Sequence, residues 1–244
     1  MMRLILALLL VLVAATARAD DPAHFTPAQR AEIVAIMRQA LKSDPSILRD
    51  AVIALQAEES ARHAGAAASA IERLGPALTA APGDPVAGNP HGDVTVVEFY
   101  DLRCPYCRRM LPVLDALIHS DPKLRVVYKD IPILGPGSVL GAKAVLAAER
   151  QGGYLRMHEL LMQGSSQITD ASVRSAAQTA GLDWTRLQRD MADPAIEARI
   201  NANLALAHTL DIDGTPAFVV GKQLLPGALE LSELQDAVKA ARMH

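Results

Sequence analysis

The chain has 244 residues, half of them hydrophobic, with 24 basic and 27 acidic side chains and a net charge of −3. This length allows one or two domains, and the apolar fraction is sufficient for a packed core. The charge balance excludes a typical nucleic-acid-binding protein, because that class requires a basic footprint.

The first residues have the pattern of a secretory signal peptide. Arg3 gives a positive start, an apolar run follows from Leu4 to Ala15, and Ala17-Arg18-Ala19 supplies small residues at the cleavage positions. The run is too short to span a bilayer as a helix. We expect residues 1–19 to be removed, which leaves 22 basic and 27 acidic residues. The sequence therefore predicts export to the periplasm and no further membrane segment, with an uncleaved anchor as the alternative.

Residues 20–60 are predicted to form a helical arm of two amphipathic helices between Phe25 and Glu59. Thr26-Pro27 resembles an N-cap followed by a proline at the first helical position, and Ser43-Asp44-Pro45 separates the two helices. A segment of this size cannot build a core by itself. Its apolar stripes must pack on other copies of the arm or, alternatively, on the rest of the chain.

Residues 61–85 are predicted to be a linker. Its first part is rich in alanine, so the helix can continue into it, but Gly75-Pro76 and the run Pro82 to Pro85 break any helix. A change from patterned sequence to such residues is typical of a domain boundary.

Residues 86–244 are predicted to be an α/β domain. A buried strand at 94–100, a helix from Cys104 to about His119 adjusted at Pro112, and a strand at 124–129 make a right-handed βαβ unit. Helical patterns then fill an insert of about 137–210, before short strands at 217–220 and 223–225 and a helix at 231–242.

The only two cysteines are Cys104 and Cys107, in the motif Cys104-Pro105-Tyr106-Cys107. A disulfide between them closes a very small loop and stabilises the fold little, so a chemical role is the better interpretation. A zinc site is the alternative, but zinc usually takes four ligands and no second C-x-x-C or nearby histidine pair is present.

The position of the motif favours redox chemistry. At a strand-to-helix junction, backbone N–H groups stabilise a thiolate at Cys104, and Cys107 lies about one turn later on the same face. Pro105 and Tyr106 help to set how strongly the pair oxidises. The arginines at 103, 108 and 109 add positive charge nearby, with surface or substrate-docking roles as the alternative.

Glu98 lies inside an otherwise apolar strand six residues before Cys104. A buried carboxyl needs a partner or a task. Burial raises its pKa and suits it to move protons for Cys107. Lys129, in the neighbouring strand, is a candidate partner, and a solvated glutamate at the sheet edge is the alternative.

Gly214-Thr215-Pro216-Ala217-Phe218 precedes the strand after the insert. A cis bond before Pro216 would leave the Thr215 backbone free to pair with an extended substrate, as in strand addition. Taken alone, an ordinary trans proline is the simpler interpretation, but the C-x-x-C upstream favours the cis form.

These residues together resemble the DsbA-like branch of the thioredoxin superfamily, over roughly residues 86–244. The carriers are Val96 to Asp101 before the C-x-x-C, the helical insert, and Gly214 to Phe218. The resemblance implies a thioredoxin-like fold with a helical insertion. It also implies the following roles: Cys104 as the nucleophile, Cys107 as the resolving thiol, Glu98 as the buried acid and Pro216 as the cis-proline, with Pro105, Tyr106 and Thr215 contacting the substrate. No cofactor beyond the redox-active disulfide is expected.

The arm is similar to the N-terminal region of the ScsC type of suppressor-of-copper-sensitivity proteins. The similarity is carried by Phe25-Thr26-Pro27, Ile33-Val34, Ile36-Met37 and Asp44 to Leu48. In that family this region can oligomerise, including as trimers, and the proteins can isomerise wrong disulfides. The resemblance therefore implies a homo-oligomer, exported cysteine-containing proteins as substrates, and a membrane reductant of the DsbD/ScsB type.

Three functions remain open from the sequence. The first is a periplasmic disulfide isomerase or reductase that oligomerises through its arm. The second is a monomeric dithiol oxidase of the DsbA type with the same catalytic residues. The third is a copper-tolerance protein that binds Cu(I) through Cys104 and Cys107, because thiolates are soft ligands.

Overall fold

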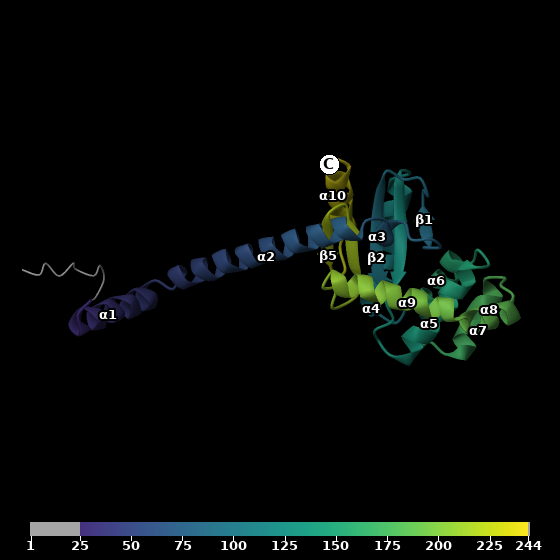
Figure 1. Ribbon diagram of the computed structural model, residues 1–244, viewed down its shortest axis with the longest axis horizontal. Coiled ribbons are helices and arrows are strands. Elements are labelled where there is room, and N and C mark those ends of the chain that lie inside the picture. The colour runs from purple at the N-terminus through teal and green to yellow at the C-terminus, as the bar shows by residue number, and fades with distance from the viewer. Residues whose placement is uncertain (1–24, 244) are drawn as a thin grey trace, which may run out of the picture. The chain divides into compact units, whose positions relative to one another are not determined.

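The computed structural model describes residues 25–243, so the predicted signal peptide, 1–19, lies outside the described residues. The chain divides into two compact units between Ala57 and Glu58. This division falls close to the predicted end of the arm at residue 60. Figure 1 shows helix α1 and the start of α2 in the first unit and all the strands in the second.

Two helices form the first unit, α1 (Pro27–Ser43) and the first part of α2 (Ser46–Leu74). The Thr26 hydroxyl accepts a hydrogen bond from the Gln29 backbone N–H, and the Gln29 side-chain oxygen accepts one from the Thr26 backbone N–H, which makes a capping box. No residue of α1 is buried. The large exposed apolar side chains of this unit are Phe25, Ile33, Val34, Ile36, Met37, Leu41, Ile47, Leu48, Val52, Ile53 and Leu55.

The predicted linker contains more regular structure than its composition suggests. Helix α2 continues through the alanine-rich run to Leu74, as the high helix propensity of alanine allows. Gly75, at φ +46°, ends it, and the short helix α3 (Pro76–Thr79) follows. Ile71 and Leu78 are buried, so this part of the chain belongs to the core of the second unit.

The sheet of the second unit has five strands in the order β1-β3-β2-β4-β5. These are β1 (Val86–Gly88), β2 (Val94–Tyr100), β3 (Leu124–Asp130), β4 (Ala217–Val220) and β5 (Gln223–Pro226). Strands β2 and β3 are parallel, and the other neighbours are antiparallel. Strand β1 was not predicted, because three residues that end in glycine carry too little pattern.

The two faces of the sheet bury different sets of residues, since side chains alternate along a strand. On one face, Val96 and Tyr100 pack with helices α4 (Pro105–Ser120) and α10 (Leu231–Arg242). On the other face, Val97 and Phe99 pack with α3, the end of α2 and the end of α9 (Pro194–Thr209). Helix α4 continues through Pro112.

The insert is helical, as the sequence predicts. It contains α5 (Pro136–Glu149), α6 (Tyr154–Gln163), α7 (Asp170–Thr179) and α8 (Trp184–Met191), followed by α9. The four helices α5–α8 gather in one group beside the sheet (Figure 1). The second unit is therefore a thioredoxin-like α/β fold with a helical insertion.

Candidate active site

The two cysteines lie where β2 leads into α4. Cys104 is the N-cap of α4, with extended backbone angles, and Pro105 occupies the first helical position. Cys104 and Cys107 are reduced, with no disulfide between them, and both are buried. Cys104 Sγ donates to the carbonyl oxygen of Thr215 at 3.1 Å, so residues 111 positions apart in sequence meet at this thiol.

The pKa of Cys104 is lowered from 9.0 to about 5. The main cause is a hydrogen bond from the Cys107 side chain, and the Thr215 side chain and the backbone N–H groups of Cys107 and Tyr106 contribute further, while burial opposes them. Cys104 is therefore a thiolate at neutral pH, and a thiolate is the form that attacks disulfides.

Cys107 behaves in the opposite way. Burial raises its pKa far above the ordinary value, and the hydrogen bond to Cys104 and the negative charge of Glu98 raise it further. Cys107 thus retains its proton until a base removes it. The pair contains one nucleophile ready to react and one thiol that needs activation.

Glu98 is the nearest candidate for that base. It is 1% exposed, which excludes the solvated glutamate considered from the sequence. Burial, followed by the charges of Asp130 and Cys104, raises its pKa to about 8. Its Oε1 has no hydrogen-bond partner among the described residues. A buried carboxyl with a pKa near neutrality can accept and return a proton.

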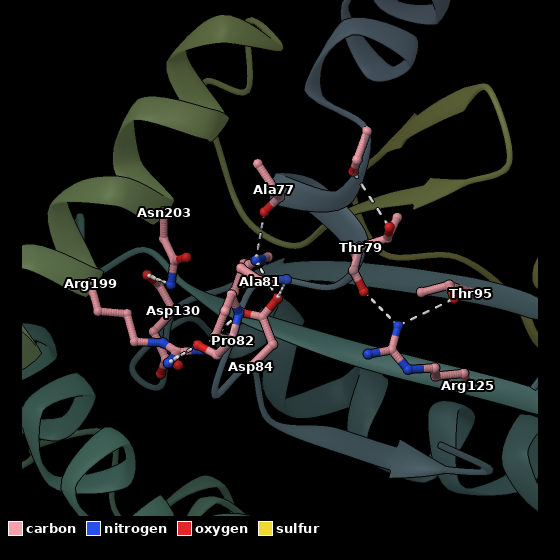
Figure 2. A network of polar contacts seen from close by, with 12 residues as sticks. Ala77, Thr79, Ala81, Pro82, Asp84, Thr95, Arg125, Asp130, Arg199 and Asn203 are labelled. Carbon is pink, nitrogen blue, oxygen red and sulfur yellow. Dashed lines mark hydrogen bonds and ion pairs between the residues drawn. The ribbon is translucent and has the colours of Figure 1, made fainter. Parts of the chain in front are cut away.

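The predicted partnership of Glu98 with Lys129 is wrong. Glu98 pairs in register with Tyr128, so Lys129, the next residue, points to the opposite face of the sheet. Lys129 Nζ lies 2.7 Å from Asp84 Oδ2 and donates to the Ala77 carbonyl at 3.2 Å. Figure 2 shows Asp84 and Ala77 in this network. The cysteines pack in the cluster on the other face of the sheet.

The face with Lys129 also holds a cavity of about 860 Å³. Asp84 lies in the wall of this cavity and forms a second ion pair, in which its Oδ1 lies 2.8 Å from Arg199 Nη2 (Figure 2). This network joins the segment after α3 to β3 and α9. None of the predicted site residues lines the cavity. We therefore assign the ion-pair network beside it a structural role.

The Thr215–Pro216 bond is cis, as the sequence pattern predicted. A groove of about 290 Å³ runs along residues 211–217 and the β5 residues Leu224 and Pro226. Tyr106 is half exposed, and the Arg109 guanidinium lies 4.4 Å above the centre of its ring. The site thus has an apolar aromatic group and a groove on the surface that surrounds Cys104.

Asp101 holds the loops that surround the motif, a role that the sequence analysis did not identify. It is buried, and it accepts hydrogen bonds from the backbone N–H groups of Arg103, Ile133 and Leu134 and from the Ser138 hydroxyl, all between 2.8 and 3.0 Å. The available signal was its place directly after a buried strand and three residues before Cys104.

Arg108 is also more than a surface charge. Its guanidinium donates to five backbone carbonyls, those of Leu102, Leu161, Met162, Gly164 and Ser165, at 2.7 to 3.1 Å. It therefore fastens the catalytic helix α4 to the end of α6. Burial lowers the pKa of Arg108, and the charge of Asp101, followed by the cysteine pair, opposes that shift.

Within residues 25–243 there is no cluster of three or more His, Cys, Asp or Glu residues that could hold a metal ion. Cys104 and Cys107 are the soft donors on which the Cu(I) interpretation depends. In the same part of the chain, no helix is both long and apolar enough to cross a membrane.

Comparisons with known proteins agree with this geometry. Residues 95–239 match the DSBA-like thioredoxin domain. The crystal structure of a thioredoxin-like oxidoreductase from Silicibacter pomeroyi is 48% identical, covers 69% of this chain and 98% of its own, and superposes with a TM-score of 0.68. A structure of Proteus mirabilis ScsC in a transitional conformation is 29% identical, covers 90% of this chain and 97% of its own, and has a TM-score of 0.66.

The curated relatives are longer proteins. A Na⁺/H⁺ antiporter, NhaA 3 of Salinispora tropica, is 31% identical over 160 residues, which is 65% of this chain and 24% of the antiporter. The chain thus spans about a quarter of the length of the curated relatives that it matches. The domain match spans strands β2 to β5, the cysteine motif and the helical insert. The chain belongs to the DsbA-like thioredoxin domain family.

Proposed function

We propose that this chain is a periplasmic thiol–disulfide oxidoreductase with Cys104 as its nucleophile. The observation that carries the proposal is the contact of Cys104 with Thr215, which places a thiolate at the start of α4 beside the cis-proline loop. Export rests on the signal peptide that the sequence predicts at residues 1–19.

The chemistry proceeds in two exchanges. The Cys104 thiolate attacks one sulfur of a substrate disulfide, and the other sulfur leaves as a thiolate that takes a proton from water. Cys107 then gives its proton to the Glu98 carboxylate and attacks Cys104 Sγ. The Cys104–substrate bond breaks, and the electron pair leaves with the substrate sulfur. The substrate gains two electrons and the two cysteines lose them; run backwards, the same steps oxidise a substrate.

Substrate binding uses the surface around Cys104. An extended segment can pair with the Thr215 backbone beside Pro216 and lie in the groove along residues 211–217. Pro105 and Tyr106 contact the substrate from the other side of the thiol. Cysteine-containing exported proteins are the substrates that we propose.

Within this class we favour a disulfide isomerase or reductase. The exposed apolar side chains of α1 and the start of α2 support self-association, because a contiguous apolar surface is typical of an interaction site. Several active sites around one misfolded substrate suit isomerisation. We propose a homo-oligomer, a trimer being one form, and a membrane reductant of the DsbD/ScsB type that keeps Cys104 and Cys107 reduced.

The test is reactivation of scrambled ribonuclease by the purified protein, together with thiol trapping of both cysteines in the periplasm. We expect reactivation, a mostly reduced pair, and loss of activity in Cys104→Ser. A mostly oxidised pair without reactivation would instead support the monomeric DsbA-type oxidase. For copper, undiminished Cu(I) binding by a variant with both cysteines changed to serine would exclude the thiols as the site.

The role of the arm is tested without truncation, because Ile71 and Leu78 of the predicted linker belong to the core. Ile36→Lys and Leu48→Lys place charges on exposed apolar positions, and Gln39→Lys adds the same charge at an exposed polar position of α1. We expect light scattering to show smaller species and lower isomerase activity for the first two variants only. The proposed interface would be contradicted if all three variants were monomeric, the control included, or if all three kept the oligomeric state of the wild type.

A further inference from the structure

The face of the sheet that carries Glu98 buries a second carboxyl, Asp130. Register pairs Glu98 with Tyr128 and Tyr100 with Asp130 across strands β2 and β3. Because alternate residues share a face, these four side chains form one block under helices α4 and α6. All four are at most 4% exposed.

Asp130 closes a ring of three polar groups. The Tyr100 hydroxyl donates to Asp130 Oδ1, and the Tyr154 hydroxyl, from α6, donates to Oδ2 at 2.9 Å. The two hydroxyl oxygens are 2.6 Å apart, so they form the third contact. On the main chain, Asn203 donates to the Asp130 carbonyl at 3.2 Å (Figure 2). The carboxyl is therefore held from strand β2 and from helix α6, and α9 holds the main chain of the same residue.

Counting protons shows that this ring accepts two charge states. With Asp130 ionised, two hydroxyl protons serve three contacts, so one contact has no proton. A proton on the carboxyl fills it and completes the ring. Burial raises the pKa of Asp130 to about 7, although the hydrogen bonds from Tyr100 and Tyr154 lower it. The ring can thus hold either number of protons near neutral pH.

Among the neighbours that act on Glu98, Asp130 is the one whose own charge changes most near neutral pH. After burial, its charge is the largest cause of the raised pKa of Glu98, followed by Cys104 of α4. Of the other titratable groups of the cluster, Tyr100, Tyr128 and Tyr154 have pKa values raised by burial, and His158 of α6 has its pKa lowered to about 3 by burial. Those four stay neutral. Cys107 faces Glu98 as a thiol, while Asp115 contributes to the raised pKa of Tyr128 and Arg199 opposes the raised pKa of Asp130.

We propose that Asp130, held by Tyr100 and Tyr154, is a positioning residue that sets the pH at which Glu98 accepts the proton of Cys107. The inference rests on the proposed thiol–disulfide exchange and concerns its second step. In that step the proton moves from Cys107 Sγ to Glu98, the Cys104–Cys107 bond forms, and the substrate thiolate departs with the electron pair. An ionised Asp130 makes Glu98 a stronger base and delays its ionisation to higher pH.

The variant Asp130→Asn keeps the shape of the side chain and removes its charge. Reduced protein is mixed with glutathione disulfide and quenched with acid, and mass spectrometry follows the conversion of the mixed disulfide to the Cys104–Cys107 disulfide across pH. We expect the rising limb of the rate to move to lower pH by about one unit, since a nearby like charge shifts a carboxyl by this order. In a Glu98→Gln background, Asp130→Asn should move nothing.

Two outcomes would overturn the inference. If Asp130→Asn slows the conversion equally at every pH and the rising limb of the pH profile stays in place, Asp130 only supports the fold. If the rising limb also shifts in the Glu98→Gln background, the shift belongs to a group other than Glu98. If Asp130→Asn does not fold, ¹³C NMR of the carboxyls in the wild type and in Tyr154→Phe decides instead. Removing that donor should make Asp130 easier to protonate and lower the titration midpoint of Glu98, and an unchanged midpoint refutes the coupling. This measurement requires no activity, so a wild type without thiol–disulfide exchange would defeat the proposed function alone.

Discussion

The lowered pKa of Cys104 predicts that the reduced protein gains stability as the pH rises from about 5 to about 9. The sign follows from linkage: the folded state holds the thiolate, while the unfolded chain binds a proton up to its ordinary pKa. The stabilisation is therefore complete above pH 9 and is lost as the pH falls through about 5. Glu98 and Asp130 act in the opposite direction, because their raised pKa values make stability fall as the pH rises.

The magnitude can be worked out from the shift from 9.0 to about 5. Each pKa unit corresponds to about 1.4 kcal/mol, so full ionisation would contribute about 5 kcal/mol, and pH 7 realises about half of that. Solvent close to the start of α4 screens part of this interaction, so we expect about 1.5 kcal/mol at pH 7.

The assay is urea denaturation of the reduced protein at a series of pH values, compared with Cys104→Ser. Subtracting the variant removes the contributions of Glu98 and Asp130 to the extent that they do not depend on Cys104. The free-energy difference should grow steadily between pH 5 and pH 9. A difference that does not change with pH would refute the lowered pKa.

A matched pair of variants tests the cause of the shift. The hydrogen bond from the Cys107 side chain is the largest contribution to the low pKa of Cys104. Cys107→Ala removes the donor, whereas Cys107→Ser keeps a hydroxyl in its place. Titrating the thiolate absorbance of Cys104 should give a higher pKa in Cys107→Ala than in Cys107→Ser. Equal values would show that the helix backbone, and not Cys107, holds the thiolate.

Three further predictions concern groups outside the thiol pair. Arg108→Lys keeps the charge but cannot reach five carbonyls, so we expect a loss of about 2 to 3 kcal/mol of unfolding free energy in urea titrations and slower exchange with glutathione disulfide. Lys129→Met leaves the buried Asp84 with Arg199 as its remaining ionic partner and should cost about 3 kcal/mol, with the thiolate pKa of Cys104 unchanged because the pair lies on the other face. Leu78→Ala should cost about 2 to 4 kcal/mol in calorimetry, and a cost near zero would show that α3 does not belong to the core.

The residues that sequence reasoning located are those that carry local signals. Cys104 and Cys107 form a C-x-x-C motif at the predicted start of a helix. Glu98 is an acid in an otherwise apolar strand, and Pro216 directly precedes a β-branched strand. The bounds of the helical insert, predicted at about 137–210, lie close to the observed start of α5 at Pro136 and end of α9 at Thr209, because glycines and prolines punctuate its helical segments.

The features that were missed depend on contacts between distant segments. The assignment of Lys129 to Glu98 failed because proximity of two strands does not give the face on which a side chain lies. Four of the five carbonyls that bind Arg108 lie in the last turn of α6 or just after it, more than fifty residues away, and their availability depends on where α6 ends. Similarly, Asp130 gains its partner Tyr154 only when the insert folds against the sheet.

Strand β2 explains how one element serves both the fold and the chemistry. Its residues alternate between a face that packs against α3 and α9, with Val97 and Phe99, and a face that carries Glu98 and Tyr100. The insert covers part of the second face with Tyr154 of α6, which donates a hydrogen bond to Asp130. Burial on this face raises the pKa values of Glu98 and Asp130, although the hydrogen bond from Tyr154 lowers that of Asp130. The helical insertion therefore contributes, through Tyr154, to the surroundings of Asp130, whose charge acts on Glu98 in the proton chemistry that we propose for Cys107.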